Sequence, residues 1–155
     1  MRDQRFVAEH RGGPLSMHDH RLLALWAADC AEHVLSDLWK DDNDPRPFDA
    51  IRQARAWARG EISVGEARKA AVAAHAAARE SQDAAATAVA RAAGHAVATA
   101  HMADHSLGGA LYALKALKIA GQSIDPERKW QDEQLPSEIK ELVLTTRQTR
   151  KFKDP

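Results

Sequence analysis

Apolar residues recur at three- and four-residue steps along most of this chain, and that spacing predicts helices that each bury one face. The clearest series lies within residues 22–39 and comprises Leu23, Trp26, Ala27, Cys30, Val34 and Leu38. Similar spacing predicts helices over 47–59, 64–81, 84–120 and 137–145, with a short helix after Pro126. A single helix over 84–120 would be about 55 Å long at roughly 1.5 Å per residue, so we expect a break within 104–109, where Ser106 caps a new helix.

Capping residues mark several of the predicted boundaries. Ser16 and Ser63 are each followed three residues later by an acid, which predicts capping boxes at two helix starts. Gly60 stands where a left-handed residue ends a helix. We therefore expect an all-α, single-domain bundle of six or seven helices over 16–146. Residues 1–15 are expected to form an extended arm, and 147–155 a basic, loose tail.

Composition and charge restrict the environment and the partners. The chain has 155 residues, equal numbers of acidic and basic residues, and one cysteine. A lone cysteine cannot form an internal disulfide, and no apolar stretch is long enough to span a bilayer. These features predict a cytoplasmic protein with no membrane partner, and the balanced charge argues against nucleic acid.

Polar residues within the apolar faces are the first candidates for chemistry. Asp29 and His33 lie on or beside the buried stripe of the first helix, and His101 and Asp104 have similar positions further along the chain. A buried carboxylate needs a partner, so we expect these four side chains to meet across a helix interface. Two interpretations stay open: a structural hydrogen-bonded network, and a divalent metal site that also draws on His105.

Charged side chains on the second predicted helix and before it are candidates for binding. Arg52 and Arg55 fall along one side of that helix, where they form either a solvated face or a site for an acidic partner. Asp42 belongs to an acidic loop over 41–44. We predict that these three residues contribute to partner binding.

Three segments, 20–35, 54–60 and 94–101, resemble the Imm-five-like immunity proteins. That resemblance implies a small, all-helical bacterial protein, without enzymatic activity, that neutralises a cognate toxin by direct binding. The residues 37–44 depart from the likeness, as expected of a surface that faces a variable toxin. A homodimer through an alanine-rich helix face is also expected. The alternative is a small metal-binding helical protein, with enzymatic activity left open. Positions that carry the likeness include Trp26, Asp29, Cys30, Glu32, His33, Arg55, Trp57, His95, His101 and His105.

Overall fold

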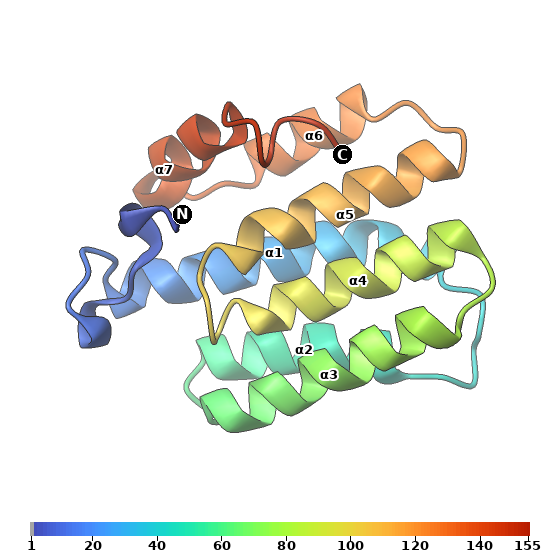
Figure 1. The fold of residues 1–155 in the computed structure, drawn as a ribbon, viewed down its shortest axis with the longest axis horizontal. Helices are drawn as coiled ribbons and strands as arrows, with labels where there is room; N and C mark the ends of the chain where they lie inside the picture. The colour runs from blue at the N-terminus through green and yellow to red at the C-terminus, as the bar shows by residue number, and fades with distance from the viewer. Residues whose placement is uncertain (1) are drawn as a thin grey trace.

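The computed structural model describes residues 2–155, which form seven α-helices and no β-strand (Figure 1). The all-α class predicted from the sequence is confirmed. The helices are α1 (Met17–Leu38), α2 (Arg46–Ala58), α3 (Val64–Glu80), α4 (Ala84–Ala98), α5 (His105–Ile119), α6 (Asp125–Glu133) and α7 (Ser137–Arg147).

Local capping signals place most of the helix ends. The Ser16 hydroxyl accepts from the Asp19 backbone N–H at 3.0 Å, and the Ser63 hydroxyl accepts in the same way from Glu66 at 3.1 Å. Gly60, with a φ of +77°, follows α2 in the left-handed region, as predicted. The expected capping residues therefore open α1 and α3.

The break between α4 and α5 lies slightly before its predicted place. Helix α4 ends at Ala98 and α5 begins at His105, so the chain turns between these residues. Ser106 does not cap α5, because it lies inside the first turn and its hydroxyl donates to the Ala103 carbonyl at 2.7 Å. The serine hydroxyl therefore donates to a nearby carbonyl and does not accept from an unpaired N–H at the start of the helix.

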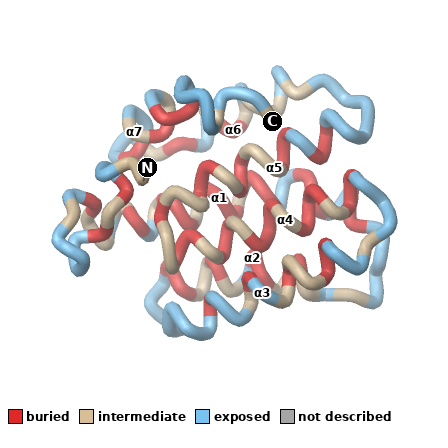
Figure 2. Tube along the Cα trace, viewed as in Figure 1, coloured by how far each residue is buried: buried red, intermediate tan, exposed pale blue. Residues whose placement is uncertain are grey.

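Helix α4 occupies the middle of the bundle. It packs against α1, α2, α3 and α5, and ten of its fifteen residues are buried, so little of its surface faces solvent. Buried positions concentrate along α1, α4 and α5 (Figure 2). Alanine at helix contacts lets the axes approach closely, which fits the composition of this helix.

The buried apolar side chains form two clusters. The first, here called the alanine cluster, joins α1–α5 and is built mainly from alanines such as Ala27, Ala74, Ala93 and Ala96. The second, the large-residue cluster, joins the N-terminal segment, α1, α5 and α7. Its members are Phe6, Leu15, Leu23, Trp26, Cys30, Ala103, Leu107, Ala110, Leu135, Ile139 and Val143.

The N-terminal segment is packed onto the bundle, in contrast to the extended arm expected for 1–15. Two short 3₁₀ turns, Gln4–Phe6 and Glu9–Arg11, fold residues 4–11, and the side chain of Phe6 is fully buried. The Arg5 guanidinium donates to the Thr145 hydroxyl of α7 at 2.7 Å. Burial of an aromatic side chain stabilises this docking by about 1.5–3 kcal/mol, which local sequence propensity does not reveal.

The C-terminal segment also differs from the loose tail expected for 147–155. Arg147 still belongs to α7 and is buried, where it donates to the Asp132 carboxylate at 2.5 Å and to the Gln131 side chain. Beyond it, Phe152 packs on the large-residue cluster and Arg128 donates to the Lys153 carbonyl at 2.9 Å. The Phe152 ring and the hydrogen bond from Arg128 hold this segment against α6 and α7, and the partly buried Arg147–Asp132 ion pair joins α7 to α6.

Candidate functional site

Arg55 of α2 joins two acids of α1 in an interhelical network. Its guanidinium donates to Asp29 at 2.8 Å and to both carboxylate oxygens of Glu32, at 2.6 and 3.0 Å. These contacts lower the pKa of Glu32 and raise the pKa of Arg55. Asp29, predicted as a metal ligand, is thus an ion-pair partner of Arg55, which had been predicted to bind a partner protein.

His33 lies next to this network and contacts α6. Its ring stacks almost parallel on Trp130, with 3.5 Å between ring centroids, and its Nδ1 is 2.5 Å from the Glu127 carboxylate. An N–H at Nδ1 donating to that carboxylate accounts for the geometry. A shallow opening of about 160 Å³ lies beside the pair and is lined by Asp29, Glu32, His33, Trp130 and Gln134.

The other candidate metal ligands lie elsewhere, at the junction of α4 and α5. His20, near the start of α1, donates from Nε2 to the Thr99 carbonyl at 2.6 Å, so the junction faces that end of α1. His33 lies thirteen residues further along the same helix, about 20 Å away at 1.5 Å per residue. The expected meeting of Asp29 and His33 with His101 and Asp104 is therefore wrong.

The metal site inferred from the sequence is not formed. His101, Asp104 and His105 sit at the start of α5 or just before it, and residues 2–155 contain no group of three or more His, Cys, Asp or Glu side chains placed to hold a metal ion. The face predicted for His101 and Asp104 assumed a helix that continues to residue 104, whereas α4 ends at Ala98, and the side chain of His33 is exposed. The periodicity also carried no information about the height of each side chain along the bundle.

A histidine cluster that was not predicted from the sequence forms between α3, α4 and α5. His75 of α3, His95 of α4 and His105 of α5 lie in ring contact, and Tyr112 stacks on His95 with 5.0 Å between centroids. Burial lowers the pKa of all three histidines, and that of His95 falls to about 3. The available signal was the pair of helical glycines, Gly94 and Gly108, whose missing side chains admit these rings.

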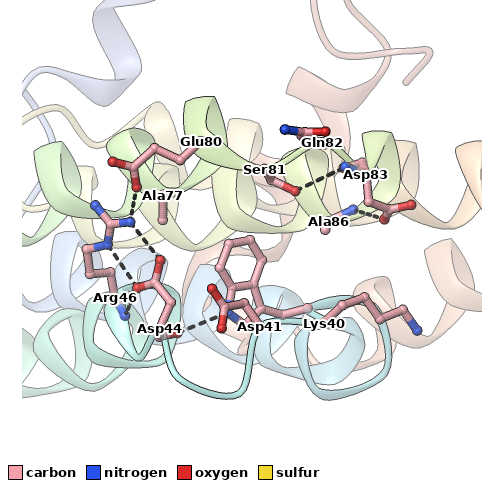
Figure 3. A pocket seen from close by; sticks show the side chains of 11 residues that line it. Lys40, Asp41, Asp44, Arg46, Ala77, Glu80, Ser81, Gln82, Asp83 and Ala86 are labelled. Carbon is pink, nitrogen blue, oxygen red and sulfur yellow. Dashed lines mark hydrogen bonds and ion pairs between the residues drawn. The ribbon is translucent and has the colours of Figure 1, made fainter.

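A pocket lies at the end of the bundle where α1 and α3 finish and α2 and α4 begin (Figure 3). This bundle-end groove has a volume of about 550 Å³. Its lining residues are Trp39, Lys40, Asp41, Asp44, Arg46, Ala77, Glu80, Ser81, Gln82, Asp83 and Ala86. Four helix ends thus contribute to one concave surface.

Hydrogen bonds fix the walls of the groove. Arg46 donates to the two carboxylate oxygens of Asp44 at 2.8 and 2.7 Å and also contacts Glu80, which joins α2 to α3 (Figure 3). The buried ring of Trp39 donates from Nε1 to the Asp44 carbonyl at 3.0 Å. Asp83 caps α4 by accepting from the Ala86 N–H at 2.8 Å.

The charge of the groove is predominantly acidic. Four of its lining side chains are acids and two are bases, and Arg46 is engaged by the carboxylates of Asp44 and Glu80. Asp42, predicted to contribute to binding, is exposed in the turn beside the lining residue Asp41. A basic group that approaches this end of the molecule meets more negative than positive charge.

A second exposed surface lies along α2. Phe48 is 44% exposed and lines an opening of about 300 Å³ together with Glu32, Ile51, Arg52, Arg55 and Arg59. Arg52 points largely into solvent and contacts Asp49 of its own helix. Two arginines were predicted to bind a partner protein. Arg52 is exposed, whereas Arg55 forms ion pairs with acids of α1.

The protein is thus a small helical bundle with two open, charged surfaces, the bundle-end groove and the surface along α2. The Imm-5 like putative immunity protein family matches residues 13–138, which is most of the chain, and the protein belongs to that family. No curated protein and no solved structure matches the chain. Among residues 2–155, no helix is both long enough and apolar enough to cross a membrane.

Proposed function

We propose that this protein is an immunity protein that neutralises a toxin protein by direct binding. The observation that carries the proposal is the family match, which extends from residue 13 into α7 and so includes the whole of α1 to α6. The description of the family, as putative immunity proteins, supports this function, and the geometry supplies a concave, charged surface for such binding.

The bundle-end groove is the proposed docking surface. It combines an apolar floor, to which Trp39, Ala77 and Ala86 contribute, with a charged rim, the arrangement typical of protein interfaces. Its walls are held by the Arg46 ion pairs and by the Asp83 cap. A partner that docks on a preformed surface loses less free energy to ordering side chains than one that docks on flexible loops.

The rim indicates what the partner presents. Asp41 and Asp42 project from the loop between α1 and α2, and neither forms an ion pair with another described side chain. Exposed acids of this kind attract lysine or arginine side chains and raise the association rate. We propose that the toxin brings basic residues to this rim, with Arg52 and Phe48 of α2 as a flanking contact.

A rescue experiment tests the proposal. Each toxin candidate encoded beside this gene is expressed in a test bacterium with and without this protein, and growth is measured. Rescue by the wild-type chain is expected, together with a one-to-one complex of the two purified proteins. Absence of both for all neighbouring candidates would overturn the immunity function.

Charge reversal tests the docking surface separately. The double variant Asp41→Lys/Asp42→Lys is expected to weaken the purified complex at least tenfold and to reduce rescue. Glu133→Lys/Glu141→Lys is the matched control, since it makes the same change of charge at exposed positions on α6 and α7. Equal affinity of both variants and the wild type would place the docking surface elsewhere.

A further inference from the structure

The histidine cluster connects three consecutive helices of the bundle. His75 meets His95 edge to face with 5.4 Å between ring centroids, and His95 lies 5.0 Å from His105. Because the three rings come from α3, α4 and α5, each ring contact is also a contact between helices. Whatever changes the charge of these rings acts directly on the packing of three helices.

Two glycines provide the space in which the rings sit. A Cβ at Gly94 would lie 2.8 Å from the His75 ring, and a Cβ at Gly108 would lie 2.9 Å from Nδ1 of His95. A glycine within a helix is destabilising relative to alanine, because its backbone loses more conformational freedom on folding. Close packing of the imidazoles therefore depends on two residues that are otherwise unfavourable at these positions.

The hydrogen bond to Arg91 assigns one proton. Its guanidinium Nη1 lies 2.9 Å from Nδ1 of His75, and a guanidinium only donates. Nδ1 of His75 must therefore accept, which leaves that ring uncharged with its proton on Nε2. A proton added at Nδ1 would remove the hydrogen bond and place a second positive charge against Arg91.

The contact between His95 and His105 also restricts where a proton can lie. Their Nδ1 atoms are 3.0 Å apart, so one must donate and the other must accept. The two rings share one proton along this line. Protonation of both Nδ1 atoms would set two N–H groups against each other at a hydrogen-bonding distance.

The surrounding charges are mostly positive and offer little compensation for a protonated ring. Around the cluster, Arg79 comes from α3, Arg91 from α4, and Lys115 lies 5.4 Å from the centre of the Tyr112 ring on α5. The junction contributes His101 and Asp104, and the chain ends contribute Arg2 and Lys151. Asp104 is the acid of this group, and its charge offsets only part of the lowering of the His105 pKa that burial causes.

We propose that His75, His95 and His105 form an acid-sensitive clasp, which holds α3, α4 and α5 together only while the three rings are uncharged. An open or unfolded chain binds protons at these rings below their ordinary pKa of about 6.5, whereas the closed clasp does not. The folded state is therefore fully stabilised above that pH and loses stability as the pH falls below it. The clasp is independent of the toxin-binding proposal.

The first test is the stability of the wild-type protein at two pH values. Urea unfolding at pH 7.5 and 5.5 is expected to show an unfolding constant that rises about tenfold for each ring kept uncharged, as calculated from an unfolded pKa of 6.5. Amide hydrogen exchange locates the change: protection in α3–α5 is expected to fall more than protection in α7.

Variants assign the effect to the cluster. His95→Gln keeps a neutral hydrogen-bonding side chain and is expected to remove about one tenfold step from the pH dependence. His10→Gln, which changes an exposed histidine of the Glu9–Arg11 turn, is the control, and its pH dependence is expected to match that of the wild type. An unchanged pH dependence in His95→Gln would overturn the proposal.

A measurement on the wild-type chain covers the case in which the variant fails to fold. Nitrogen-detected NMR of the imidazole rings reports the tautomer and the titration of each histidine. We expect His75 to carry its proton on Nε2, and His95 and His105 to be in different tautomers. Titration of His95 near pH 6.5 in the folded protein would also overturn the clasp.

Discussion

The two apolar clusters bury side chains of very different size, and they stabilise the fold in different ways. The alanine cluster contains many small side chains distributed over five helices, whereas the large-residue cluster contains a few large ones on one side of α1 and α5. Burial of one methyl-sized group contributes about 0.8 kcal/mol, and burial of a large apolar side chain about 1.5–3 kcal/mol. The first cluster therefore depends on close approach of its helices, and the second on a few anchors.

This difference predicts opposite sensitivities. Truncation of a large side chain leaves a cavity that rigid surroundings do not refill, so it harms the large-residue cluster most. Enlargement of a small side chain forces apart helices that are already in contact, so it harms the alanine cluster most. Substitutions in both directions make the comparison measurable.

Trp26→Ala should have the largest effect. The indole is 1% exposed, donates from Nε1 to the Gln131 carbonyl at 2.8 Å, and has the Arg147 guanidinium 5.3 Å from its centre. Its truncation is expected to lower the free energy of unfolding by about 3–5 kcal/mol. Urea unfolding followed by far-ultraviolet circular dichroism measures the loss, because that signal reports helix content and does not depend on the removed indole.

The control for this substitution is Trp130→Ala. Trp130 stacks on His33 at the partly exposed surface of α6 and belongs to neither cluster. A smaller loss is expected there, because water fills the space that the ring leaves. Equal losses in the two variants would contradict the view that Trp26 anchors the large-residue cluster.

Ala93→Leu should have the next largest effect, in the alanine cluster. Ala93 is fully buried on α4, which contacts four other helices, so three added carbon atoms have no free space. A loss of about 1–3 kcal/mol is expected from the same unfolding measurement. Ala84→Leu, at the exposed start of the same helix, controls for the change in helix propensity and is expected to be nearly neutral.

The helices of both clusters were predictable because their signals are local. Periodicity and capping act within one or two turns of a helix. Ser16 and Ser63 both lie at the starts of helices in the structure, as predicted. The docking of the chain ends was missed for the opposite reason. Phe6 belongs to a short apolar stretch and Phe152 is isolated in polar surroundings, and the packing of both rings depends on a surface built by distant helices.

Individual polar side chains were selected from the sequence, but the way in which they assemble was not predicted. Asp29 and Arg55 were both selected from the sequence, but nothing in their spacing showed that they would pair across α1 and α2. His75, His95 and His105 are separated by 20 and 10 residues and meet only because α3, α4 and α5 are packed antiparallel neighbours. The periodicity of one helix gives the direction of a side chain, whereas a site also requires the relative height of each helix.

Gly109→Ala should have the smallest effect, and it tests how closely the alanine cluster is packed. A Cβ at Gly109 would lie 3.4 Å from both the Ala27 Cβ and the Ala96 backbone nitrogen, which is tight but needs little movement. Alanine gains about 0.5–1 kcal/mol in a helix interior. We expect a net stabilisation of about 0.5 kcal/mol in urea unfolding.

Gly108→Ala is the control, because it makes the same gain in helix propensity one residue earlier. Its Cβ meets the His95 ring at 2.9 Å, so this variant should be less stable than Gly109→Ala by about 1–2 kcal/mol. A loss above 1 kcal/mol for Gly109→Ala would mean that the helices of the alanine cluster cannot separate even by a few tenths of an ångström.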